Sequence, residues 1–224
     1  MSPYYQDEHC TIYNADCREV LPELGRCDIL MTDPPYGMEY KSNRRVDHQQ
    51  LGGIAGDGEF PQWVFDIEYT SAAFIFCRWD NLPEIPKPKS FIVWDKGTHS
   101  MGDLQHEFGR QWEACAFYAG VAHQWRGGRP NDIVKIPRVP PGRLVHPTEK
   151  PVQLITKLLN TSCSDIDLQT ELDIIPVLDP FMGSGSTLQG AKDLGIKSVG
   201  IELEERYCEI AANRLSQGVL DLGV

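Results

Sequence analysis

The chain has no long apolar run and no excess of basic residues. No stretch approaches the roughly 18 apolar residues of a membrane-spanning helix. The first ten residues, MSPYYQDEHC, lack the basic and apolar regions of a secretory signal peptide. We therefore expect a cytoplasmic protein with no membrane partner. The 21 lysines and arginines are outnumbered by 32 acidic residues, for a net charge of −11, which argues against a simple coat on nucleic acid.

Cysteine pairing and zinc-type spacing are also missing. The seven cysteines are odd in number, and no two of them are separated by only two residues. Neither a disulfide framework nor a metal site is expected, and the cysteines are interpreted as reduced thiols. His123 and His146 have no serine or cysteine partner in a recognisable motif, so nothing indicates nucleophilic catalysis.

Short apolar runs and helical patterns alternate along the 224 residues, as in a single α/β domain. This alternation predicts a largely parallel, doubly wound sheet. The expected strands are at 11–14, 27–31, 73–77, 91–94, 114–118, 174–178 and 197–201. The expected helices are at 18–24, after the proline at 151, from the glycine turn at 183–185 to about 193, and at 204–215.

The sequence DPFMGSG at 179–185 lies between an expected strand and an expected helix. Glycines there let a ligand approach the backbone, and the helix N-terminus offers free N–H groups. Glu202 ends the next strand and could accept hydrogen bonds from both hydroxyls of a ribose. Because the full GxGxxG spacing is absent, a nucleoside cofactor without phosphates, such as S-adenosylmethionine, fits better than a dinucleotide. A tight turn without a ligand is the alternative.

Asp33, Pro34, Pro35 and Tyr36 follow another expected strand. Ligands of open α/β sheets bind outside the carboxyl ends of the strands, so both motifs should face one crevice. A carboxylate, a carbonyl on a stiff turn and an aromatic ring match an exocyclic amino group on a flat base. When two acceptors bind the amino hydrogens, the nitrogen lone pair is freed to attack a methyl group. A proline turn without chemistry is the alternative.

Two segments could bring basic charge to DNA. Residues 122–150 carry six basic side chains against two acidic ones, and the loop 41–57, which follows the DPPY turn, is expected to be mobile. A solvated surface loop is the alternative for 122–150, and Trp125 is the tryptophan best placed there to stack on a base. Asp95 and Lys96 are expected to form a local ion pair. The predicted DNA-binding residues are Lys41, Arg44, Arg45, Arg126, Arg129, Lys135 and Arg138.

These motifs resemble the β-class DNA amino-methyltransferases, which methylate adenine N6 or cytosine N4. In that class a DPPY block precedes the target-recognition region and an FxGxG block comes last, the order seen at 33–36 and 181–185. The resemblance covers about 10–41, 72–120 and 144–216. Four further segments agree with the family: NADC at 14–17, WDKG at 94–97, HPTEKP at 146–151 and GIEL at 200–203.

The resemblance implies one domain over 1–224 with a Rossmann-like methyltransferase fold. Its sheet would have seven mostly parallel strands with one antiparallel strand, a circularly permuted motif order, and a small target-recognition insertion at about 122–143. Catalysis is assigned to Asp33, Pro34 and Tyr36, with Pro35 shaping the turn. Cofactor contacts are assigned to Asp16, Cys17, Asp33, His146, Lys150, Asp179, Phe181, Gly183, Ser184, Gly185, Ser186, Glu202 and Leu203.

The function implied is S-adenosylmethionine-dependent methylation of adenine N6 in double-stranded DNA, with the target base flipped out. Restriction–modification is the implied context. Aspartate at position 33 resembles the adenine subgroup more than the cytosine subgroup. The alternatives are cytosine N4, a free nucleotide or RNA as substrate, and an inactive DNA-binding module. A homodimer and a restriction endonuclease partner both stay open.

Overall fold

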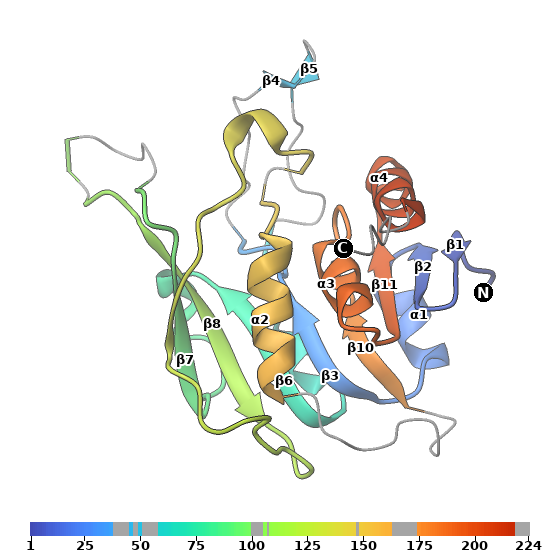
Figure 1. Cartoon of the computed structure of the whole chain (residues 1–224), viewed down its shortest axis with the longest axis horizontal. Helices are drawn as coiled ribbons and strands as arrows, with labels where there is room; N and C mark the ends of the chain where they lie inside the picture. The colour runs from blue at the N-terminus through green and yellow to red at the C-terminus, as the bar shows by residue number, and fades with distance from the viewer. Residues whose placement is uncertain are drawn as a thin grey trace, which may run out of the picture.

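In a computed structural model of the chain, the described residues are 1–37, 45–46, 49–50, 58–99, 105–106, 108–146, 148–162 and 174–217. They form one nine-stranded sheet in the order β1-β2-β11-β10-β3-β6-β8-β7-β9 (Figure 1). Its strands are β1 (Tyr5–Gln6), β2 (Cys10–Asn14), β3 (Cys27–Thr32), β6 (Tyr69–Cys77), β7 (Ser90–Asp95), β8 (Trp112–Ala119), β9 (Ile133–Lys135), β10 (Ile175–Asp179) and β11 (Ser198–Glu202).

The seven strands from β2 to β7 have the predicted directions. β2, β11, β10, β3 and β6 are parallel, and β8 is antiparallel to both β6 and β7. The sheet differs from the prediction at its edges. There β1 pairs antiparallel with β2, and β9 pairs parallel with β7. Strands of two or three residues are too short to show a periodic pattern, so pairing with a neighbouring backbone defines them.

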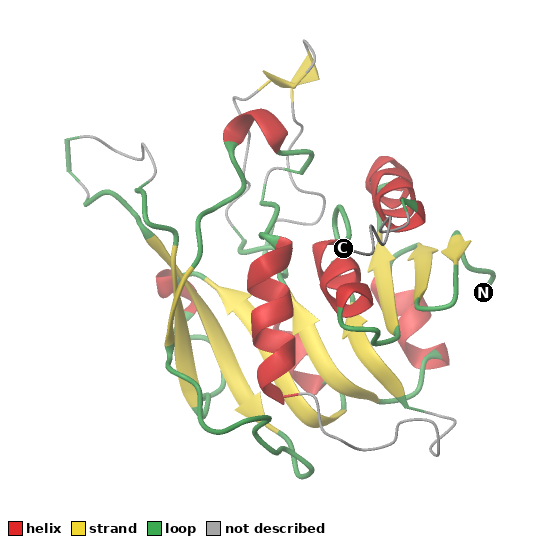
Figure 2. Cartoon of the chain, in the orientation of Figure 1, coloured by secondary structure: helices red, strands yellow, loops and turns green. Residues whose placement is uncertain are grey.

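Helices cover both faces of the sheet (Figure 2). α2 (Val152–Ser162), α3 (Ser186–Asp193) and α4 (Glu205–Ser216) pack on one face, where Phe74, Phe76 and Leu154 belong to the main core. The other face is covered by α1 (Cys17–Val20) and by the 3-10 helices η1 (Leu21–Glu23) and η2 (Gln62–Asp66). The remaining 3-10 helices are η3 (Trp79–Asn81) and η4 (Pro141–Arg143).

Three predictions concern features beyond the sheet. Within the described ranges, no helix is long and apolar enough to cross a bilayer. The six cysteines in those ranges are free and buried. The predicted mobile loop 41–57 lies mostly outside the described residues, Lys41 and Arg44 included, and the structure gives only the antiparallel pair β4 (Arg45–Val46) and β5 (Gln49–Gln50) there.

The order of strands reverses at β10, which lies between β11 and β3. The chain connects β10 to β11 through α3, whereas it leaves β3 toward β6 on the opposite side. In doubly wound sheets such a reversal leaves a crevice outside the carboxyl ends of the two central strands. The turns that follow β3 and β10 are therefore the first place to look for a ligand site.

Candidate active site

A cavity of about 870 Å³ opens at this crevice. Asp33 and Tyr36 line it from the turn after β3, Phe181 and Gly183 from the turn after β10, and Glu202 from the end of β11. The structure thus brings both motifs to one cavity. The carboxyl ends of parallel strands lie at the same edge of a sheet, which is why residues so distant in sequence meet there.

Glu202 forms the acidic wall of the cavity. One carboxylate oxygen accepts the backbone N–H of Gly183 (3.1 Å), and the other accepts that of Glu204 (2.7 Å). Gly183 has φ +51° and Gly185, which caps α3, has φ +79°, a conformation that favours glycine. Burial raises the pKa of Glu202 to about 7. Each oxygen keeps a lone pair, so the carboxylate suits the two hydroxyls of a ribose.

Phe181 and Asp16 also line the cavity. The ring of Phe181 lies 5.6 Å from that of Trp63, a residue of η2. Asp16 caps α1 by accepting the N–H of Arg18 (3.0 Å), and its ion pair with the Arg18 side chain (2.5 Å) lowers its pKa. Aromatic rings beside a hydrogen-bond acceptor fit an adenine. The predicted residues Cys17 and Leu203 also line this cavity.

Other predicted cofactor residues line a smaller neighbouring cavity of about 40 Å³, namely Lys150, Asp179, Ser184 and Ser186. Asp179 is buried there. It accepts the Thr32 hydroxyl (2.9 Å) and the Phe181 N–H (3.1 Å), and burial raises its pKa to about 6. Asp179 therefore ties the glycine turn to the end of β3. Among the described residues, no cluster of histidine, cysteine or acidic side chains could hold a metal ion.

The DPPY turn is held by its own side chains and by η3. The Tyr36 hydroxyl donates to Asp33 Oδ1 (2.5 Å), and the Asn81 side-chain amide donates to the Tyr36 carbonyl (3.3 Å). Lys150 Nζ donates to Asp33 Oδ2, so both oxygens of the carboxylate have a donor. Burial raises the pKa of Tyr36, which keeps its hydroxyl protonated. The orientation of Asp33 is thus fixed from two sides.

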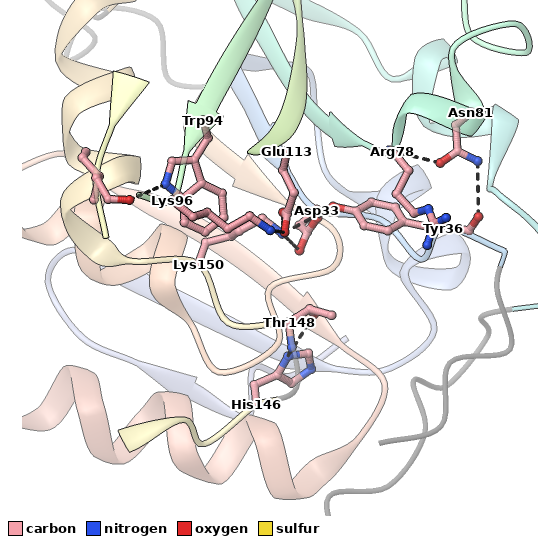
Figure 3. Close-up of polar contacts among 11 residues, drawn as sticks. Asp33, Tyr36, Arg78, Asn81, Trp94, Lys96, Glu113, His146, Thr148 and Lys150 are labelled. Carbon is pink, nitrogen blue, oxygen red and sulfur yellow. Dashed lines mark hydrogen bonds and ion pairs between the residues drawn. The ribbon is translucent and has the colours of Figure 1, made fainter. Parts of the chain in front are cut away.

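Lys150 continues into a line of charged side chains (Figure 3). Its Nζ lies 3.3 Å from Glu113 Oε2, and Lys96 Nζ donates to Glu113 Oε1 (2.6 Å). The predicted ion pair of Asp95 with Lys96 is therefore wrong. The Asp95 carboxylate instead accepts hydrogen bonds from Gly97 N–H and Gln111 Nε2, both at 2.8 Å. Neighbouring residues of an extended chain point to opposite faces, so a partner across the strands is favoured.

The residues of the HPTEKP segment that precede Lys150 are anchored by several contacts. His146 accepts the Thr148 N–H (3.3 Å), and its ring packs on Tyr207 with centroids 4.3 Å apart. Burial lowers the pKa of His146 to about 3, so the ring is neutral at physiological pH. Glu149 accepts the Val145 N–H (3.1 Å) and pairs with Arg214 of α4. These contacts fix the loop from which Lys150 reaches Asp33.

Arg126 and Arg129, two of the predicted DNA-binding residues, lie far from this cavity. Gly120 N–H donates to the Ser71 carbonyl (2.7 Å), near the start of β6, and Arg126 N–H donates to the Thr161 carbonyl (3.0 Å) at the end of α2. Arg129 follows in the same connection. Because β6 is parallel to β3 and nine residues long, these arginines are roughly 25 Å from the catalytic turn. Their placement argues against a contact beside a flipped base.

The basic residues that come later in the same segment lie at the carboxyl end of the sheet, where the cavity opens. β9 runs parallel to β7 and ends at Lys135, so the chain arrives at the carboxyl edge of the sheet. Arg138 and Arg143 follow there, and η4 lies above α2 in the view of Figure 1. Trp125, predicted to stack on a base, instead packs on Phe117 with ring centroids 5.3 Å apart. The basic stretch thus runs along the whole edge of the sheet.

Three side chains of the site were not assigned to it from sequence. Trp63 belongs to none of the motifs, yet it lines the cavity beside Phe181. Glu113 lies in β8, where its neighbours Ala114 and Cys115 are buried, and an acidic residue beside a buried run was a usable signal. Lys96 belongs to the WDKG segment, but nothing in that motif identifies its partner.

Comparison with known proteins agrees with this geometry. A family profile described as DNA methylase matches residues 104–213. The chain is 25% identical to the type II methyltransferase M.ScaI of Streptomyces caespitosus, over 95% of this chain and 83% of that protein. It is 24% identical to the type II methyltransferase M2.LlaDCHI of Lactococcus lactis subsp. cremoris, over 96% of this chain and 93% of that protein.

Solved structures share the fold. A structure titled as the complex of M1.HpyAVI with SAM has a TM-score of 0.62 at 24% identity, covering 92% of this chain and 99% of that one. The PvuII DNA methyltransferase, titled cytosine-N4-specific, has a TM-score of 0.67 at 14% identity, covering 99% and 90%. The profile and the relatives matched along nearly the whole chain support an N6/N4 DNA methyltransferase, and the solved structures share the fold of the chain.

Proposed function

We propose that this DNA methyltransferase methylates the N6 amino group of adenine in double-stranded DNA, with the target base flipped out of the helix. The amino nitrogen cannot reach a buried site while it is stacked in the duplex. The observation that carries the proposal is the fixed Asp33 carboxylate on the cavity wall, beside the ring of Tyr36. Aspartate at this position also favours the adenine subgroup.

In this proposal the protein acts by positioning and by accepting hydrogen bonds. Asp33 and the Pro34 carbonyl accept the two amino hydrogens, which frees the nitrogen lone pair, and Tyr36 stacks on the base. No covalent intermediate with the enzyme is needed. When bound, S-adenosylmethionine supplies an activated methyl group. Glu202 would hold its ribose, and Phe181, Trp63 and Asp16 its adenine, at the walls already described.

We further propose a single methyltransferase domain in which 122–143 serves target recognition. Its Val134 and Ile136 are buried, and the Trp94 indole N–H donates to the Ile136 carbonyl (2.8 Å), so the segment is built into the sheet edge. Arg138 and Arg143 are the residues proposed to meet DNA phosphates. A homodimer and a cytoplasmic location stay predictions.

The test is methylation of duplex DNA with labelled cofactor, followed by digestion and nucleoside mass spectrometry. We expect N6-methyladenine. Asp33→Ala should lower transfer at least 100-fold while calorimetry shows cofactor binding retained. N4-methylcytosine would assign the cytosine activity. Methylation of dAMP or RNA at the rate of duplex would favour those substrates, and DNA binding without transfer by the wild type would indicate an inactive module.

A further inference from the structure

Four charged side chains of alternating sign form a line that ends at the catalytic carboxylate (Figure 3). They are Lys96 after β7, Glu113 in β8, Lys150 before α2, and Asp33 after β3. The exposed fractions of the side chains are 13% for Lys96, 25% for Glu113, 7% for Lys150 and 18% for Asp33. Their contacts run in sequence from Lys96 to Asp33. The line is neutral as a whole, and no member of it is well solvated.

Burial makes the balance of these charges consequential. Removing one partner of a buried ion pair leaves an uncompensated charge, which costs more than at a surface. Lys150 is enclosed further by the ring of Phe76, with Nζ 4.9 Å from the ring centroid. In such surroundings a change of one charge alters the electrostatics of its neighbours strongly. Lys150 connects Glu113 and Lys96 to Asp33, so a change in either charge reaches the carboxylate.

Glu113 divides the attraction of Lys150 between two carboxylates. Among the described residues, Glu113 and Lys96 are absent from the lining of the large cavity, so direct contact with cofactor or base is not their task. Without Glu113, the Lys150 ammonium would be drawn to Asp33 alone. It would then withdraw negative charge from the oxygens that accept the amino hydrogens. A shared Lys150 fixes Asp33 while leaving it a strong acceptor.

We propose that Glu113 and Lys96 are positioning residues for methyl transfer, which hold the Lys150 ammonium between two carboxylates and so set the charge and orientation of Asp33. The inference rests on the proposed function of Asp33 as the amino-group acceptor. It extends the catalytic machinery from the DPPY turn to two side chains outside the cavity.

The protonation equilibria agree with this geometry. Burial raises the pKa of Asp33. The positive charge of Lys150 opposes this rise, and the negative charge of Glu113 adds to it. Burial alone would raise the pKa of Glu113, but Lys150 and Lys96 outweigh it and lower that pKa. Burial alone would lower the pKa of Lys150, but its two carboxylates raise it. The titratable groups that face Asp33 or Lys150 from the surrounding elements are Tyr36, Cys77, Glu113, Cys115, His146 and Asp179.

Because the charges alternate in sign along the line, removing Glu113 and removing Lys96 should shift the pKa of Asp33 in opposite directions. Glu113→Gln keeps the shape of the side chain and removes a negative charge, so the pKa of Asp33 should fall by roughly one unit. Lys96→Met removes a positive charge one step farther away, so the pKa of Asp33 should rise by a smaller amount. These values are measured by NMR titration of the side-chain carboxyl carbons, with Asp33→Asn to assign the signal and no cofactor added.

Kinetics then connect the charges to the reaction. The acid limb of the kcat profile should move to lower pH in Glu113→Gln and to higher pH in Lys96→Met. At the plateau, kcat of Glu113→Gln should be roughly tenfold lower with the cofactor Kd unchanged. Lys192→Met is the matched control, because it breaks a half-buried ion pair with Asp7 (2.6 Å) on another part of the sheet. It should lower Tm without moving the pKa of Asp33.

The inference would be overturned if the pKa of Asp33 shifted in the same direction in Glu113→Gln and Lys96→Met, or did not shift. A normal plateau kcat in Glu113→Gln despite a shifted pKa would also overturn it. If the NMR shifts are as expected but the wild type transfers no methyl group to DNA, the proposed function has failed while the electrostatic coupling stands. The two failures are therefore distinguishable.

Discussion

Glu202 accepts the backbone N–H of Gly183 at 3.1 Å, and this bond joins the end of β11 to the glycine turn after β10. The other carboxylate oxygen is held by the N–H of Glu204. The plane of the carboxylate is thus set in advance of ligand binding, which reduces the ordering cost of binding. The same burial raises the pKa of Glu202 to about 7, so its charge changes within the range of ordinary assays.

Cofactor affinity should therefore depend on pH. Above pH 7 Glu202 is ionised and accepts hydrogen bonds from the ribose hydroxyls, whereas below pH 7 it is increasingly protonated. We expect the Kd for S-adenosylmethionine, measured by calorimetry, to rise as the pH falls from 8 to 6. Glu202→Gln should weaken binding at pH 8 by roughly 1–3 kcal/mol and flatten the profile. An equally steep profile in the variant would assign the titration to another group.

Gly183→Ala should destabilise the protein and its cofactor site. Gly183 has φ +51°, and an added Cβ would lie 3.3 Å from His146 Nε2, which Tyr207 prevents from retreating. Gly195→Ala is the matched control, because its φ is +68° and nothing lies within 4 Å of its added Cβ. Backbone strain alone costs roughly 1 kcal/mol. Denaturant unfolding should show a larger loss for Gly183→Ala, and equal losses would mean that His146 adjusts freely.

Reversing the charge of Arg138 and Arg143 together should weaken DNA binding and reduce its salt dependence. Each lost phosphate contact lowers the log–log slope by about 0.9. The same reversal at Arg126 and Arg129 should leave both quantities close to wild type, because that connection lies at the amino end of the sheet. Fluorescence anisotropy over a salt series measures both. A larger effect at Arg126 and Arg129 would contradict the proposed DNA surface.

Much of this fold can be predicted from sequence because parallel strands buried on both faces appear as continuous apolar runs. β3 is buried along its whole length, and β6 is buried from Ser71 to Cys77. Turn residues mark where such runs end, so residue order alone places the DPPY and glycine turns at the carboxyl ends of strands. The rule that those ends share one crevice then predicts one cavity.

The edge strands β1 and β9 could not be predicted this way. Their backbone pairing with β2 and β7 defines them, and their few residues have no distinctive pattern. β9 also decides where the basic residues go, because its parallel pairing with the last residues of β7 directs the chain to the carboxyl end of the sheet. Local charge is visible in sequence, whereas its distance from the catalytic turn is not.

The partners of Lys150 show most clearly which properties can be predicted from sequence and which cannot. Residue type and local order are enough to predict that Asp33 and Glu202 end strands and that glycines permit the turn at 183–185. The position of Lys150 between Asp33 and Glu113 follows instead from the packing of segments that are distant in sequence. A lysine at 150 is compatible with many partners, and which carboxylates face it depends on how α2 and its preceding loop pack across β6 and β8. Electrostatic pairing acts through space, so it is fixed only when the strands and that loop are brought together.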